Sequence, residues 1–201
     1  MNNVIFTYNE ESALTAGQGG FINESGAYII TLSEAALKTF DTGSKAVEFS
    51  GETEDGRKVQ YLSVFTTKTD GTESKFGVAI VQAIMGCAGI RQATYQMKDA
   101  KNIVSPEFAG KKVGLVLQKT LTSKQDGSDS YKLEIKLPFI ASTRQTLKEK
   151  AEGKQAETVE RMIATLKDKD DRKKKPSGNN GAGHGDYPDY PQQDDSGFTP
   201  F

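Results

Sequence analysis

The segment from Arg57 to Lys68 combines side-chain types that suit binding to a nucleic-acid strand. It contains Tyr61 and Phe65, with Arg57 and Lys58 before them and Lys68 after them. Because alternate residues of an extended strand share a face, we expect the two rings on the same face. Flat rings can stack on unpaired bases while basic groups contact phosphates. The pattern therefore predicts a site for single-stranded nucleic acid.

Two registers of this strand are open. If Leu62 and Val64 point into a core, Tyr61 and Phe65 are exposed. In the opposite register the two rings are buried together with Val59. A shift of one residue exchanges the two faces, and apolar residues on both faces do not decide between the registers.

Further basic residues and one tyrosine fall in the turns and connections around this strand. A single lysine is usually a solvated surface charge, whereas a set of them along one groove can hold a phosphate backbone. The candidate DNA-binding residues are Lys38, Lys45, Arg57, Lys58, Tyr61, Phe65, Lys68, Arg91, Tyr95, Lys111, Lys112, Lys119 and Lys124.

Charge is distributed unevenly along the chain. The totals of 26 basic and 27 acidic residues nearly cancel. Residues 1–27 hold three acids and no base, and residues 176–201 hold four acids and no base, so residues 28–175 carry 26 bases and 20 acids, a net charge of +6. A basic centre between acidic ends favours a phosphate-rich partner, for which the acidic tail could compete.

The last residues of the chain form a candidate site for a protein partner. A pocket on the partner could take the terminal ring while basic groups at its rim hold the aspartates and the α-carboxylate. The alternative is a solubilising tail that happens to end in aromatic residues. The candidate partner-binding residues are Asp194, Asp195, Phe198, Pro200 and Phe201.

Residues for catalysis or metal binding are scarce. The one histidine, His184, lies in a glycine-rich tail without a fixed neighbour to set its pKa. With one histidine and one cysteine, Cys87, the chain cannot form a histidine–cysteine zinc site or an intramolecular disulfide. Phosphate-binding-loop and nucleophile-elbow motifs are absent. We expect no enzyme activity, metal or cofactor, although acidic clusters at 52–55 and 168–171 keep a metal-dependent nuclease open as a rival.

The location expected for the protein follows from the same composition. A single cysteine indicates a reducing compartment. No run of residues approaches the roughly 18 apolar residues of a membrane span. We therefore expect a cytoplasmic protein that does not associate with membranes.

The elements that position these residues follow from hydrophobic alternation and turn signals. Strands are predicted at residues 27–40, 45–51, 58–67, 111–121 and 131–140, and a helix at 74–87. A helix between the third and fourth of five strands is the element order of the OB-fold, a small Greek-key barrel plugged at one end by the helix. We therefore expect a mainly β, five-stranded OB-like barrel. The alternative is an ordinary antiparallel sheet with one covering helix.

The chain divides into four parts on this interpretation. They are a flexible N-terminal segment (1–25), an OB-like single-stranded DNA-binding domain (26–141), a C-terminal helix (142–170) and a disordered acidic tail (171–201). The helix is expected over about 143–167, with Ser142 and Gln145 as its capping box. Its thin apolar stripe either packs on the barrel or pairs two subunits of a homodimer. That stripe comprises Leu147, Ala151, Val159, Met162, Ile163 and Leu166.

Two parts of the chain resemble known single-stranded DNA-binding proteins. The stretch from Asp194 to Phe201 is similar to the acidic tip of the bacterial proteins, although residues 196–199 separate the aspartates from Pro200. The body, residues 26–141, resembles small bacteriophage single-strand binders of OB type, from Gly26-Ala27-Tyr28 to Gly110-Lys111-Lys112-Val113.

The resemblance implies a non-enzymatic protein that coats single-stranded DNA in phage replication and recombination. It also implies that the tip recruits replication or recombination proteins in the host bacterial cytoplasm. A recombination mediator or adaptor whose barrel mainly binds protein stays open as the alternative.

Overall fold

The computed structural model describes residues 7–8, 19–99 and 102–172. Of the predicted tail (171–201), residues 173–201, with all of the candidate partner-binding residues, lie outside the described residues. The strands are β1 (Gly20–Phe21), β2 (Gly26–Thr39), β3 (Lys45–Thr53), β4 (Arg57–Thr67), β5 (Gln96–Met97), β6 (Ile103–Val104), β7 (Lys112–Ser123), β8 (Asp129–Phe139) and β9 (Lys169–Asp170). The helices are α2 (Lys75–Ala88), the 3-10 turn η1 (Pro106–Phe108), α3 (Leu147–Ala151) and α4 (Thr158–Thr165).

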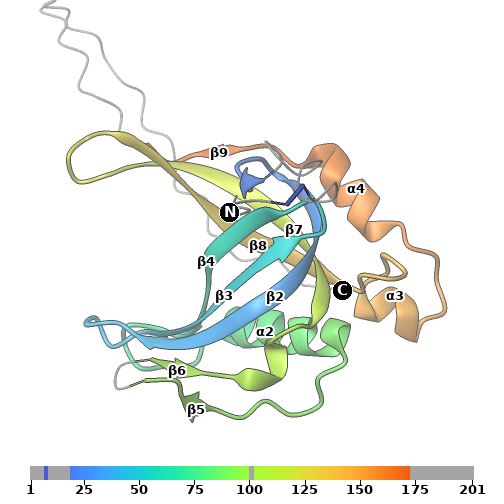
Figure 1. Cartoon of the computed structure of the whole chain (residues 1–201), viewed down its shortest axis with the longest axis horizontal. Coiled ribbons are helices and arrows are strands. Elements are labelled where there is room, and N and C mark those ends of the chain that lie inside the picture. Colours follow the sequence, from blue (N-terminus) through green and yellow to red (C-terminus); the bar gives the residue numbers. More distant parts are fainter. Residues whose placement is uncertain (1–6, 9–18, 100–101, 173–201) are drawn as a thin grey trace, which may run out of the picture.

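Five long strands form one antiparallel sheet in the order β4-β3-β2-β7-β8. The short strands extend it: β1 pairs in parallel with β4, β9 pairs in parallel with β7, and β6 and β5 continue beside β2. Figure 1 shows the curled sheet with α2, which follows the third long strand, at its lower end. The predictions of a mainly β protein and of this helix position are confirmed.

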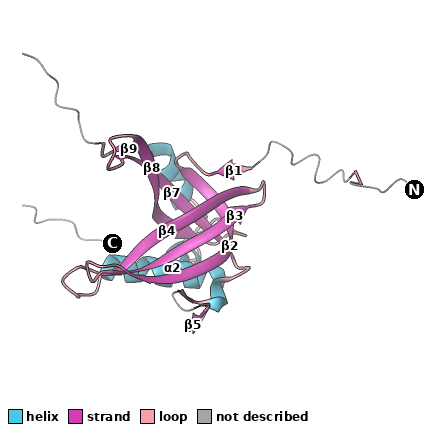
Figure 2. Cartoon of the chain, turned by 60° about the vertical axis from the view of Figure 1, so that its left-hand side comes forward, coloured by secondary structure: helices cyan, strands magenta, loops and turns pink. Residues whose placement is uncertain are grey.

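The curled sheet is a half-barrel that stays open between β4 and β8. Among the described residues, β8 pairs only with β7, and no ladder joins it to β4. The barrel expected from the order of elements is therefore not closed between these two strands. α2 packs against both β4 and β8 and lies across one end of the opening (Figures 1 and 2). We call the facing edges of β4 (residues 58–65) and β8 (residues 131–136) the seam.

The inside of the half-barrel holds the main hydrophobic core. Phe49 from β3 meets Phe108 edge-to-face with ring centroids 5.3 Å apart. Ile30 from β2, Leu115 from β7 and Ile84 from α2 are completely buried in the same cluster. The apolar face of α2, with its helical period of about 3.6 residues, and the inward faces of the strands, with their period of two, thus converge on one core.

A β-bulge in β4 decides the register of that strand. Leu62 pairs with Phe49 and Val59 pairs with Gly51, so two β4 residues, Gln60 and Tyr61, lie opposite one residue of β3. The extra residue lets Val59 and Leu62 both point inward, each only 2 % exposed. Tyr61 is consequently turned outward.

A second bulge interrupts β8 at Lys136. Val116 pairs with Leu137 and Leu117 with Ile135, so Lys136 has no partner on β7. Leu133 and Ile135, before the bulge, pack against the main core, whereas Leu137 and Phe139, after it, pack in a second cluster on the opposite face of the sheet. The alternation of apolar residues from Tyr131 to Phe139 therefore does not keep them on one face of the sheet.

The C-terminal region forms two short helices where one long helix was expected. Gly153, at φ +66°, lies in the left-handed region that ends helices, and it follows Glu152, the C-cap residue of α3. The capping box uses Thr146 and Glu149 instead of Ser142 and Gln145.

The apolar stripe of this region packs within the chain. On α4, Val159 is 1 % exposed and packs with Val116 and Phe139 on the outer face of the sheet. Leu147 packs on the main core and lies so close to Gly86 of α2 that a Cβ there would be 2.5 Å from its Cδ1. Most of the stripe therefore packs within the fold, whereas Ala151 is exposed. None of the described helices is long and apolar enough to span a membrane.

Candidate nucleic-acid interface

Two adjacent pockets open along the seam. The Phe76 pocket has a volume of about 400 Å³ and lies between β4, β8 and the first turn of α2. The Phe21 pocket, of about 310 Å³, lies between β1, β4 and β8. Tyr61, Lys132 and Leu133 line both pockets. The seam is thus a hollow of two compartments that meet at Tyr61.

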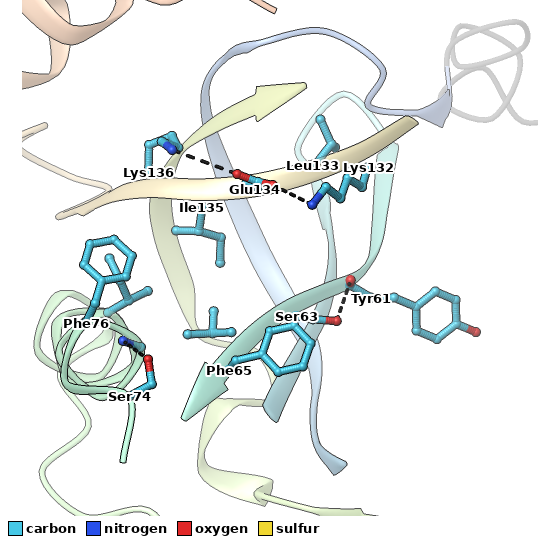
Figure 3. Close-up of a pocket in the computed structure, with 13 residues that line it drawn as sticks. Tyr61, Ser63, Phe65, Ser74, Phe76, Lys132, Leu133, Glu134, Ile135 and Lys136 are labelled. Carbon is cyan, nitrogen blue, oxygen red and sulfur yellow. Dashed lines mark hydrogen bonds and ion pairs between the residues drawn. The ribbon is translucent and has the colours of Figure 1, made fainter. Parts of the chain in front are cut away.

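Aromatic rings stand exposed around both pockets. Tyr61 and Phe76 are each 70 % exposed, Phe21 is 56 % exposed and Phe65 is 48 % exposed. Figure 3 shows Phe76 on α2 and Phe65 on β4 at opposite sides of the Phe76 pocket, with the Tyr61 ring on the side away from Phe76. Such a group of large exposed rings is typical of a binding surface, because it contributes little to the core.

Two local features bring α2 against β4 and so place Phe76 opposite Phe65. The Ser74 hydroxyl caps the helix by accepting a hydrogen bond of 3.3 Å from the Gly77 N–H. A Cβ at position 77 would lie 1.8 Å from the Phe65 carbonyl oxygen. Only glycine allows this close approach of the helix to the strand.

Charged residues at the seam are mostly basic. The two pockets are lined by three lysines, Lys58, Lys132 and Lys136, and by one acid, Glu134. The Glu134 carboxylate lies 2.8 Å from Lys132 Nζ and 3.9 Å from Lys136 Nζ. These ion pairs are exposed and therefore weak, so the lysines can exchange them for phosphate contacts.

Tyr131 forms the end of the Phe21 pocket and is held in place from two sides. Its hydroxyl donates a 3.2 Å hydrogen bond to the carbonyl of Ile22. The Nζ of Lys119 lies 5.3 Å from the centre of its ring, within the range of a cation–π interaction. Tyr131 is thus a fifth aromatic ring of the seam, and Lys119 is a fourth lysine beside it.

The structure brings only some of the candidate DNA-binding residues together. Lys58, Tyr61 and Phe65 line the pockets, and Lys119 adjoins them through Tyr131. Arg57 forms an ion pair with Asp55 at 2.8 Å and lies over the Tyr28 ring, away from both pockets. The remaining candidates also line neither pocket: Lys38, Lys45, Lys68, Arg91, Tyr95, Lys111, Lys112 and Lys124.

Residues missed in the sequence come mainly from β8 and α2. Lys132 and Lys136 alternate with apolar residues, so their exposure could have been predicted, but their position opposite β4 depends on the curling of the sheet. Phe76 has the helical spacing of a core residue with Ile80 and Ile84, yet it points into the pocket. Phe21 carried no strand or helix signal.

Groups suited to catalysis do not gather at the seam. Among the described residues, no three His, Cys, Asp or Glu side chains lie together as metal ligands would. Cys87 is buried, and burial raises the pKa of its thiol to about 11, so the thiol is not a reactive nucleophile. His184 lies outside the described residues. The seam offers stacking, ion pairing and hydrogen bonding.

Comparison with known proteins does not assign the chain to a family. No family model matches it, and a search of curated proteins finds no significant match.

Proposed function

We propose that this chain is a non-enzymatic single-stranded DNA-binding protein that holds the strand along the seam. The observation that carries the proposal is the set of exposed rings around two pockets that three lysines also line. Unpaired bases stack on such rings, and the phosphates that join them contact the lysines. Stacking depends little on base identity, so we expect weak sequence preference.

The strand arrangement supports an OB-type fold for this protein. The OB-fold is a five-stranded, partly open Greek-key barrel that commonly binds oligonucleotides. Here β2, β3, β4, β7 and β8 take the place of its five strands, and α2 follows the third. The opening between β4 and β8 is then the open part of the barrel.

The bulges at the seam favour a nucleic acid over a peptide that adds as a strand. An extended peptide binds a sheet edge through a regular ladder of backbone hydrogen bonds. β4 is bulged at Gln60 and Tyr61, and β8 is bulged at Lys136. Bulges disrupt such ladders and protect edges from pairing. This is why DNA binding ranks above the adaptor or recombination-mediator alternative.

The C-terminal tip completes the proposed function. Asp194, Asp195, Phe198, Pro200 and Phe201 lie outside the described residues, so their role rests on the sequence alone. We propose that they recruit replication or recombination proteins to DNA that the seam has bound.

Fluorescence anisotropy with labelled oligonucleotides tests the proposal. The full chain should bind single-stranded dT20 more tightly than a 20-base-pair duplex, with or without Mg²⁺, and should leave the oligonucleotide uncut. Phe76→Ala should weaken binding, because it removes a ring from the seam. Tyr95→Ala is the matched control, since Tyr95 is 73 % exposed but lines neither pocket. Tighter binding to duplex, or equal effects of the two variants, would contradict the proposal.

A further inference from the structure

We propose that Tyr61 is a wedge that separates two consecutive bases of the bound strand, one in each pocket. This inference rests on the proposed function and specifies how the seam reads a strand. It makes a two-nucleotide step the smallest complete ligand.

The first argument is the conformation of Tyr61. Its φ of +58° lies in the left-handed region, which residues other than glycine, asparagine and aspartate rarely adopt. Its N–H lies 3.4 Å from the Ser50 hydroxyl across the bulge, within hydrogen-bonding distance. Bulges re-aim a side chain relative to the regular alternation of a strand. A backbone held in this unfavourable conformation while its ring stays 70 % exposed points to a ligand for that ring.

The second argument is the place of Tyr61 between two compartments of similar build. The Phe76 pocket has Phe65 and Phe76 in its lining, and the Phe21 pocket has Phe21 and Tyr131. Tyr61 is the aromatic residue that lines both pockets. A base in either pocket would therefore lie beside Tyr61 and beside the two other rings of that pocket.

The third argument is size. Pocket volumes of about 400 and 310 Å³ are at the lower end of the range for small-molecule sites, about 300–1,000 Å³. Each pocket suits one base with its sugar, and neither suits a base pair. A duplex would have to unpair to enter.

The fourth argument is the charge where the compartments meet. Lys132 lines both pockets. A phosphate that joins the two bases would have to pass this junction, where the Lys132 ammonium can replace its 2.8 Å contact with Glu134 by a contact with phosphate. The junction thus provides a cation for the linking phosphate and a ring for each base.

Competition for labelled dT20 by unlabelled dT1, dT2, dT3 and dT4 tests the wedge. For the wild type, dT2 should compete about 5- to 150-fold better than dT1, the contribution of stacking one more base. Adding the third and fourth nucleotides should each improve competition less than adding the second did.

Three variants distinguish insertion of Tyr61 between two bases from general stacking on exposed rings. Tyr61→Gly accepts the positive φ and removes the ring, so it should abolish the advantage of dT2 over dT1 while melting like the wild type. Tyr61→Phe should retain that advantage. Phe21→Ala should reduce it by removing a stacking ring from one compartment only.

The outcomes distinguish the inference from the function on which it rests. If the wild type fails to bind labelled dT20, both are wrong. If it binds dT20 but dT2 competes no better than dT1, or if Tyr61→Gly keeps the advantage of dT2, the wedge is wrong and the proposed function stands.

Discussion

A ring that is half exposed in the free protein contributes less to folding than a ring that is buried. Phe65 is 48 % exposed and contacts Phe40 with ring centroids 5.4 Å apart, whereas its neighbour Leu62 is 2 % exposed. We expect Phe65→Ala to weaken binding to oligo-dT by about 1–3 kcal/mol. We expect Leu62→Ala to lower the free energy of unfolding by about 2–5 kcal/mol. Thermal melting beside DNA titration checks both; a Phe65→Ala variant that melts as early as Leu62→Ala would contradict the assignment.

The sequence left the orientation of these residues undecided for a physical reason. Regular alternation allows either Leu62 and Val64 inside, or Val59 with Tyr61 and Phe65 inside. The bulge combines features of both registers, because Val59, Leu62 and Val64 are all buried while the rings are exposed. A bulge depends on the partner strand, where Gly51 is pressed against β2, and hydrophobic pattern within β4 alone does not encode it.

The helices α3 and α4 are held together by one carboxylate, that of Glu149. It accepts hydrogen bonds from the N–H groups of Thr146 at 2.8 Å, Glu157 at 3.0 Å and Thr158 at 2.7 Å. Burial raises the pKa of Glu149, but these bonds and the one from the Thr158 hydroxyl outweigh it and hold the pKa at about 2. The ionised carboxylate thus caps the start of both helices.

Glu149→Gln should therefore destabilise the protein in a pH-dependent manner. The depressed pKa contributes stability that is complete above the unfolded value of about 4.5 and is lost as pH falls towards 2. At pH 7 we expect the variant to lose about 1–3 kcal/mol of unfolding free energy, because buried donors lose their charged acceptor. Urea denaturation at pH 7 and pH 3 measures the difference in unfolding free energy between the wild type and the variant. This difference should be smaller at pH 3. Glu152→Gln, an exposed position on the same segment, is the control. A loss of stability that is equal at both pH values would contradict this role of Glu149.

Elements with strong local signals were predicted well, and elements set by tertiary packing were not. The five long strands and α2 begin and end within a few residues of their predicted bounds. The predicted C-terminal helix is interrupted near Gly153. The interruption allows α4 to pack against Phe139, a tertiary contact that local sequence does not indicate. Strands of two residues, such as β5 and β6, have no periodicity of their own because their pairing partner defines them.

At the scale of the whole molecule, electrostatics should control affinity. Three lysines line the pockets: Lys58, Lys132 and Lys136. If each contacts one phosphate, the log–log slope of the association constant against salt should be about −2, from roughly −0.7 per contact on a single strand. Lys132→Gln should reduce the slope by about 0.7, whereas Lys111→Gln, which lies outside both pockets, should leave it unchanged. A salt-independent association constant would contradict phosphate binding at the seam.

The charge distribution along the chain can be predicted from the sequence, but the position of each basic residue on the folded surface cannot. The basic centre and acidic ends can be counted, and the order of elements predicts a mainly β protein with a helix after the third long strand. Counting charges does not say which basic residues lie together at the seam. Arg57 is drawn to Asp55 and Tyr28, and only Lys58 next to it reaches the seam. That selection depends on how the sheet curls, which is a property of the whole fold.

The acidic tail should compete with DNA for the basic body. Residues 176–201 carry four acids and no base, and they lie outside the described residues. DNA has a denser charge than the tail and should displace it from basic residues. Deleting 176–201 should therefore raise affinity for oligo-dT, mostly at low salt where charges are least screened. The gain should be modest, because exposed ion pairs contribute only about 0–1 kcal/mol each.

Deleting Phe201 alone should have a different effect from deleting the whole tail. The net charge of the side chains is unchanged, so binding to oligo-dT should equal that of the full chain. The terminal ring that a partner pocket would hold is gone, so recruitment of replication or recombination proteins should be lost. Pull-down from a bacterial lysate with the full chain, the Phe201 deletion and the tail deletion, alongside DNA titration, measures both effects. The tail hypothesis is wrong if the tail deletion lowers DNA affinity, or if the Phe201 deletion retains every partner of the full chain.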